Sequence, residues 1–263
     1  MRVRQVGDSA AGAEVITCEW SNKAHLDSKA QQPYRWHSHL RGQLLCIQSG
    51  VVQIKTVSGT WVLPPNRAGW IPPGAQHSIL FCSEVSGYSV LFQPNLCEAL
   101  PGKPYVLGVN PLLKSMIIRS QTWCKDLLTE ENMRIADVMT DEIRNAESEK
   151  LYLPMPRDSR LLRIAEAVLN EPGSPKTVEQ WAEFGALSAR SLRRLMPAET
   201  GLTFAQWRTQ VQLNHALALL SQNVPVGDVA FSLGYTTTSN FIAMFKKMMG
   251  DSPAHYFSRT KEL

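Results

Sequence analysis

Two segments in the C-terminal part of the chain repeat one another, and this repeat constrains the fold more than any other feature. Residues 178–207 correspond to residues 225–257 at an offset of 48 positions that becomes 49 after the turn. Each copy holds two short stretches whose apolar residues follow the i, i+3, i+4 spacing of one helix face. The offset changes in the turn, where loop length is free to vary. The pattern predicts two copies of one helical hairpin.

The second copy has the features of a DNA-reading hairpin. Its apolar stripes are Val226, Val229, Ala230 and Leu233, then Phe241, Met244, Phe245 and Met248, closed by Gly234 and Gly250. Two short helices joined by a tight turn form a helix-turn-helix, whose second helix enters a major groove. Small hydrogen-bonding side chains and cations lie between the stripes: Thr237, Thr238, Ser239, Asn240, Lys246 and Lys247. For a single copy, an ordinary hairpin with a solvated face is the alternative.

The first copy and the segment after it strengthen the DNA-binding hypothesis. Its matching apolar residues are Val178, Trp181, Ala182, Leu192, Leu195 and Met196. One longer amphipathic helix is predicted between the copies from Phe204, Trp207, Val211, Leu217 and Leu220. A stiff spacer would hold the two units about one DNA turn apart, roughly 34 Å, so that they enter successive major grooves.

Residues 158–260 resemble the DNA-binding domain of the AraC/XylS family of bacterial transcription regulators. The matching elements are the aliphatic-Ala helix, Gly234-Tyr235, Ser239-Asn240-Phe241, Phe245-Lys246 and the Gly250-x-Ser-Pro-x-x-Tyr256 segment. The resemblance implies a sequence-specific regulator with a DNA-binding domain at 159–260 and helix-turn-helix units at about 177–198 and 225–248. It also implies promoter DNA as partner, and RNA polymerase if the protein is an activator.

The first recognition helix is expected to carry most of the sequence specificity. Ser188 should cap it, and Arg190, Arg193 and Arg194 point away from its apolar stripe. Arginine can bridge the O6 and N7 atoms of guanine, although a solvated arginine cluster is the alternative. Pro197 departs from the family pattern and predicts that this helix ends or kinks early.

In the second recognition helix the contacts are expected from smaller groups. Thr238, Ser239 and Asn240 are the candidate base contacts, and Lys246 and Lys247 are candidate phosphate clamps. Short side chains predict looser base reading there.

The N-terminal part, residues 1–150, predicts a different fold. Alternating apolar and polar residues broken by glycine and proline over residues 1–100 favour many short strands and hence a small barrel or jelly roll. His37-x-His39, Gly50 and the segment from Gly69 through Gly74 to His77 resemble the two motifs of the cupin barrel. The fold class is therefore α+β, with a cupin-like barrel, appended helices and an all-α C-terminal domain.

The cupin resemblance implies an effector pocket and raises the question of a metal. In cupins the histidines and a glutamate bind a metal, but the glutamate position is here most nearly filled by Gln43. We therefore expect no cofactor, with Zn²⁺ or Fe²⁺ on His37, His39 and His77 as the alternative. The expected pocket residues are His37, His39, Gln43, Trp70 and His77, and Trp36 and Trp61 could add apolar walls. For each of the three tryptophans taken singly, a place in the plain core is the favoured alternative.

From about Pro111 the pattern turns helical, with a predicted stripe at Ile135, Val138, Met139 and Ile143. A helix pair appended to a barrel predicts a homodimer seam, with packing on the barrel itself as the alternative. Two prolines in residues 151–158 predict a linker, followed by a helix capped by Asp158 or Ser159.

Composition bounds the remaining choices. The 263 residues allow two domains, and the net charge of +4 means that any DNA-facing basic surface is local. Scattered cysteines and the lack of a long apolar run predict a cytoplasmic protein without a membrane span. We expect a regulator rather than an enzyme. The alternatives are a metal-dependent cupin enzyme fused to a DNA-binding domain, and an architectural DNA binder without effector.

Overall fold

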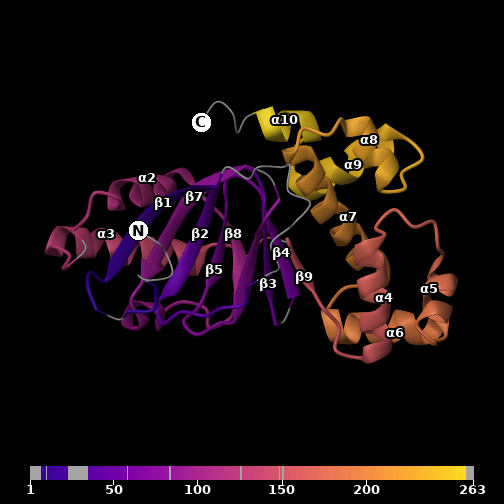
Figure 1. Cartoon of the computed structure of the whole chain (residues 1–263), viewed down its shortest axis with the longest axis horizontal. Coiled ribbons are helices and arrows are strands. Elements are labelled where there is room, and N and C mark those ends of the chain that lie inside the picture. The colour runs from indigo at the N-terminus through magenta and orange to yellow at the C-terminus, as the bar shows by residue number, and fades with distance from the viewer. Residues whose placement is uncertain are drawn as a thin grey trace. The chain divides into compact units, whose positions relative to one another are not determined.

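The computed structural model describes residues 7–9, 11–22, 35–57, 59–82, 84–124, 126–147, 149 and 151–258 (Figure 1). The chain divides into two compact units, one formed mainly by residues up to Tyr152 and the other by residues from Leu153 onward. The first is rich in strands and the second is helical, which confirms the predicted fold class. No helix in the described ranges has the length and apolar character needed to cross a bilayer.

Two sheets build the N-terminal unit. The strands are β1 (Val15–Asn22), β2 (Gly42–Ser49), β3 (Val52–Thr56), β4 (Gly59–Leu63), β5 (Arg67–Ile71), β6 (His77–Phe81), β7 (Val85–Phe92), β8 (Tyr105–Gly108) and β9 (Tyr152–Pro154). Among the described residues, one sheet has the order β1-β7-β2-β5-β8 and the other the order β6-β3-β4-β9. A Cβ atom on Gly69 of β5 would lie 3.0 Å from Leu63 of β4 and 3.2 Å from Ile54 of β3, so the two sheets pack face to face.

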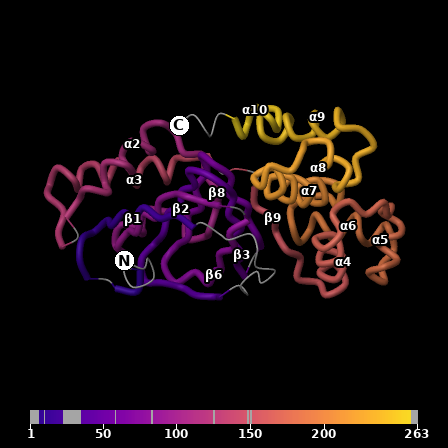
Figure 2. Tube along the Cα trace, turned by 45° about the horizontal axis from the view of Figure 1, so that its top comes forward, coloured from indigo at the N-terminus to yellow at the C-terminus, as the bar shows by residue number. Residues whose placement is uncertain are grey.

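The register of β2 and β5 separates two cores. Leu44 pairs with Trp70, and Gln43 pairs with Ile71. Because successive side chains of a strand point to opposite faces, Trp70 and Gln43 lie on opposite faces of the sheet. Trp70 belongs to the core that the sheet shares with the following helices, α2 (Pro111–Ser120) and α3 (Glu130–Asn145). Figure 2 shows α2 and α3 beside β1.

The apolar stripe of α3 differs from the predicted one. Met139 and Ile143 are buried as expected, but Val138 is 43% exposed. The buried face is centred on Ala136, Met139, Thr140 and Ile143. Val138 lies about 100° around the helix from Met139, so it faces away from the sheet.

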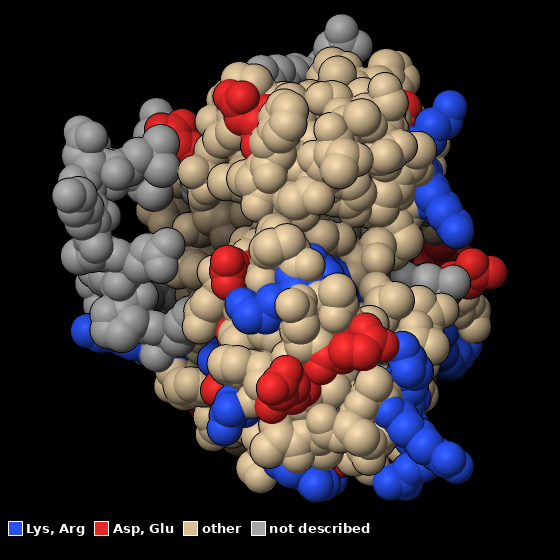
Figure 3. Space-filling view, turned by 90° about the vertical axis from the view of Figure 1, so that its right-hand side faces the viewer, with Lys and Arg blue, Asp and Glu red and all other residues tan. Residues whose placement is uncertain are grey.

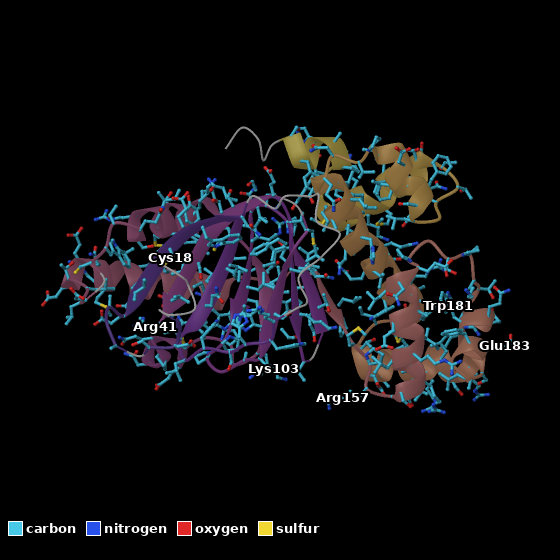
Figure 4. All side chains as sticks on the ribbon, viewed as in Figure 1. Cys18, Arg41, Lys103, Arg157, Trp181 and Glu183 are labelled. Carbon is cyan, nitrogen blue, oxygen red and sulfur yellow. The ribbon has the colours of Figure 1, made fainter. Side chains whose placement is uncertain are left out.

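The C-terminal unit contains the two predicted hairpins and the spacer helix. Its helices are α4 (Ser159–Asn170), α5 (Val178–Phe184), α6 (Ala189–Thr200), α7 (Phe204–Ser221), α8 (Val226–Ser232), α9 (Thr238–Met249) and α10 (Pro253–Ser258). Asp158 caps α4 by accepting bonds from the backbone N–H groups of Arg160 and Leu161. Apolar residues of α4, α5, α6 and α7 form one core that includes Trp181 (Figure 4). All five residues predicted for the spacer stripe are buried in α7.

The repeat holds at the level of single hydrogen bonds. Helix α8 lies 48 positions after α5, and α9 lies 49 positions after α6. In the first turn, Leu187 N donates to Ala182 O (2.8 Å), and in the second Tyr235 N donates to Ala230 O (3.0 Å). Both recognition helices end at a glycine with a left-handed backbone, Gly201 and Gly250.

One prediction about a chain break needs correction. Pro197 does not end α6, which continues for three residues to Thr200. The missing N–H of a proline removes one bond to the preceding turn, but Pro197 O still accepts a bond from Gly201 N (2.9 Å) at the end of the helix. Residues 152–154, inside the predicted linker, form strand β9.

Candidate nucleic-acid interface and sensor site

Helix α6 presents three arginines from one hairpin. The hydroxyl of Ser188 accepts a bond from Ser191 N (3.1 Å) and starts the helix, as predicted. Leu192 and Met196 are buried, which fixes the rotation of α6 about its axis. This leaves exposed the three side chains selected from the sequence: Arg190, Arg193 and Arg194. Their guanidinium groups therefore share one solvent-facing surface of the helix.

Arg193 is held by an acidic partner that the sequence analysis did not select. Its Nη2 atom lies 2.7 Å from Oε1 of Glu179 on α5. The pKa of Glu179 is lowered, first by a hydrogen bond from its own backbone N–H and then by Arg193. Both side chains are about 60% exposed, so DNA could reach the guanidinium. No sequence motif marks this pair, because the two residues belong to different helices.

Helix α9 presents smaller groups and then cations. Thr237 caps the helix by accepting a bond from Asn240 N (3.3 Å). Phe241 and Phe245 are buried, and of the predicted contact residues Thr238 is half-buried while the others are exposed: Ser239, Asn240, Lys246 and Lys247. The two lysines lie in the last turn, where cations are favoured by the helix dipole.

Charge is unevenly distributed over this end of the molecule. Figure 3 shows blue and red side chains together over the lower half of this face, whereas the upper half is mostly uncharged, with cations at one edge and a few acidic side chains. Neither half is uniformly basic.

Three imidazoles gather in the N-terminal unit. The ring centroid of His77 lies 4.1 Å from that of His37 and 5.0 Å from that of His39. Each Nδ1 atom lies near a backbone oxygen two residues away in the chain, those of Arg35 (3.2 Å), Arg41 (2.5 Å) and Ala75 (2.9 Å). Such contacts fix the orientation of an imidazole ring.

Gln43 joins this cluster and occupies the second nitrogen of His39. Its Oε1 atom lies 2.9 Å from His39 Nε2, and its Nε2 atom donates to Ser89 Oγ (2.7 Å). Both nitrogens of His39 are thus engaged, so a metal at the three histidines would first have to break the bond with Gln43. Among the described residues, no group of three His, Cys, Asp or Glu side chains has an arrangement suited to a metal ion. The residues present do not fit a metal centre.

Trp70 does not belong to this cluster, contrary to the prediction. Its indole N–H donates to Pro101 O (2.8 Å), and its ring packs against Phe92 in the core with α2 and α3. The pattern of strand residues does not reveal which face a tryptophan takes when both faces are buried. Of the two tryptophans expected as apolar walls of the pocket, Trp61 is fully buried and Trp36 is 45% exposed.

A buried arginine beside the cluster was also missed. Arg41 (Figure 4) donates to the backbone oxygens of Ser9, Ala11 and Ala13, each at 2.8 Å. Burial lowers the pKa of Arg41. Arginine is rarely fully buried, so nothing in the sequence selects this residue.

Comparisons with known proteins identify a family for each of the two parts of the chain. Residues 24–130 match the AraC-like ligand binding domain family, and residues 181–259 match a helix-turn-helix domain family. The HTH-type transcriptional regulator NimR of Escherichia coli is 33% identical over 227 residues, which cover 85% of this chain and 82% of NimR.

Two further relatives match a smaller part of the chain. The HTH-type transcriptional regulator RipA of Corynebacterium diphtheriae is 29% identical over 106 residues, covering 40% of this chain and 31% of RipA. The solved C-terminal domain of AraT, a response regulator from Geobacillus stearothermophilus, is 32% identical with a TM-score of 0.35, covering 37% of this chain and 82% of that domain. NimR and RipA are transcriptional regulators, not enzymes. The chain belongs to the AraC family and is a DNA-binding transcriptional regulator with a ligand-binding domain ahead of its helix-turn-helix domain.

Proposed function

We propose that the protein recognises a promoter sequence with α6 and α9 and that a small molecule bound in the N-terminal unit controls this recognition. The observation that carries the proposal is the duplicated hairpin, whose two capped recognition helices both turn polar side chains to solvent. In this proposal Arg190, Arg193, Arg194, Thr238, Ser239 and Asn240 read bases, and Lys246 and Lys247 hold phosphates. Sensing belongs to residues 1–150 and DNA binding to 159–260, with 151–158 between them.

The effector site is proposed at the imidazole cluster. His37, His39, Gln43 and His77 offer both hydrogen-bond donors and acceptors next to the interior of the two sheets, which suits a small polar ligand. We further propose that the protein acts in the cytoplasm as a homodimer. If it activates transcription, RNA polymerase is an additional partner.

Specific DNA binding is tested by the variant Arg193→Ala. We expect it to weaken binding to the selected promoter site by about 1–3 kcal/mol, because a bidentate contact to guanine is lost. Binding to random duplex should change less, and both affinities are measured by fluorescence anisotropy at several salt concentrations. Arg144→Ala, at an exposed position of α3, is the control. An equal loss on all sequences would mean that Arg193 only holds phosphate.

The effector site is tested by His39→Ala and His77→Ala. Both variants should keep the wild-type affinity for promoter DNA and lose the change in that affinity caused by compounds that raise the melting temperature of the wild-type protein. The reason is that these side chains lie in the N-terminal unit and not in the recognition helices. If both variants still respond normally, the pocket lies elsewhere. An architectural binder would instead show no preference among promoters.

A further inference from the structure

The two hairpins are joined by more than the spacer helix. Gly173 lies in the loop between α4 and α5, and Gly234 lies in the turn between α8 and α9. A Cβ atom on Gly173 would lie 2.2 Å from Ser232 O, and a Cβ atom on Gly234 would lie 2.6 Å from Gly173 O. Real Cβ atoms essentially never come so close to a backbone oxygen. The backbone before the first hairpin therefore rests directly on the turn of the second.

One side chain of the spacer helix binds both of these segments. Gln212 of α7 donates from Nε2 to Leu233 O (2.9 Å) and to Pro172 O (3.4 Å). Its Oε1 atom accepts a bond from the hydroxyl of Tyr235 (3.2 Å). A single amide thus links α7 to the loop before α5 and to the turn after α8.

A second side chain, one helical turn earlier, holds the same loop. Arg208 of α7 donates to Lys176 O (3.3 Å) and to Ser174 O. Residues 208 and 212 are four apart and lie on one face of the helix. The loop that leads into the first hairpin is therefore attached to α7 at two points, and to the second hairpin by the glycine contact.

We infer that Gly173, Gln212 and Gly234, which we call the coupling junction, set the distance and the rotational phase between α6 and α9. The apolar core of the first hairpin fixes it on α7 but, among the described residues, contains none of α8 or α9, so that core does not tie the two hairpins to one another. The junction closes a ring through the loop before α5, the turn after α8 and α7, and so ties them together. Gln212 is a positioning residue, and the inference rests on the proposed role of α6 and α9 in base reading.

The expected consequence is a strict spacing between two half-sites on the DNA. One inserted base pair turns the second half-site by about 34° around the duplex axis and moves it by about 3.4 Å. A rigid pair of hairpins cannot follow this change, whereas a loosened pair can.

The experiment uses the full-length chain and a duplex that the wild-type protein has selected from a random pool. Base pairs are inserted or deleted singly between the two half-sites, and each half-site is also tested alone. The wild-type affinity should fall at least about tenfold for one inserted base pair, as a lost contact of about 1.4 kcal/mol would cause. Gln212→Met, which keeps an unbranched side chain of similar length but loses the bonds, should reduce this fall to below about threefold while half-site affinity stays unchanged.

Gly173→Ala should act in the same direction, because its Cβ atom would push the loop off the turn. Gly227→Ala is the matched control: its Cβ atom would meet only Thr238 Oγ1, at 3.9 Å, and it should keep the wild-type spacing profile. If Gly173→Ala does not fold, Gln212→Met carries the test alone.

Two results would overturn the inference. The first is that the affinity of the variants falls as steeply with inserted or deleted base pairs as that of the wild type. The second is that the wild-type affinity does not depend on the spacing at all. Failure of the proposed function would look different. In that case Arg193→Ala would leave the affinity for the half-site read by α6 unchanged, however the affinity depends on the spacing.

Discussion

At the scale of single residues, the two copies of the hairpin place different residues at the left-handed position of the turn. Both turns need a left-handed residue at the same place, and the second uses Gly234 (φ 79°) where the first uses Ala186 (φ 56°). An L-residue in this conformation costs about 1–2 kcal/mol because its Cβ atom crowds the next carbonyl. The first turn therefore carries a local strain that the second avoids.

Replacing Ala186 by glycine should relieve this strain. We expect Ala186→Gly to stabilise the C-terminal unit by about 0.5–1 kcal/mol, since part of the gain is offset by the entropy of glycine in the unfolded chain. Thermal unfolding measures the effect. Ala198→Gly, at an exposed position inside α6, should instead destabilise the unit by about 1 kcal/mol. Destabilisation by both changes would show that Ala186 is not strained.

At the scale of elements, α7 combines the functions of core and spacer. It buries apolar side chains along much of its length, and His215 is half-buried among them. Desolvation lowers the pKa of His215 from its usual 6.5, opposed in part by a hydrogen bond with the backbone of Leu169. The helix therefore holds an imidazole whose pKa in the folded chain lies below that of a free histidine.

This burial predicts a pH dependence of stability. Below about pH 6.5 the histidine of the unfolded chain takes up a proton more readily than the folded one, so stability falls as pH decreases. The melting temperature of the wild type should therefore drop between pH 7.5 and pH 5.5. His215→Gln should reduce that drop. An unchanged drop in His215→Gln would assign the acid sensitivity to other groups.

At the scale of the whole molecule, the proposed homodimer requires an interaction surface, and the outer faces of α2 and α3 offer exposed apolar residues for it. Leu112 and Ile118 of α2 and Val138 of α3 are exposed apolar residues on helices that cover the sheet. Exposed apolar residues gathered on neighbouring elements mark interaction surfaces. This is the surface that we assign to the proposed homodimer.

Placing a charge on this surface should separate the dimer without unfolding the protomer. We expect Val138→Asp to raise the dimer dissociation constant at least about tenfold, because a carboxylate would lose its hydration in the interface. Analytical ultracentrifugation measures the constant, and circular dichroism checks the fold. Asp137→Asn, at the neighbouring exposed position, is the control. If the wild-type protein stays monomeric at all concentrations measured, the proposed homodimer is wrong.

Much of this architecture follows from the sequence by itself. The repeat at 48 and 49 positions, the stripe of α7 and the caps Asp158 and Ser188 are all confirmed, because the apolar spacing inside each copy, the stripe and the caps each depend on residues close together in the chain. Side-chain periodicity and capping are local effects, so a linear pattern contains them completely.

Only the tertiary structure decided which side chains from distant segments meet. It moved Trp70 from the pocket to the core under α2 and α3, continued α6 through Pro197, paired Arg193 with Glu179 and brought Gly173 onto Gly234. These outcomes depend on how whole elements pack, and packing is chosen by the sum of many weak contacts between residues far apart in the chain. No short stretch of sequence contains that sum.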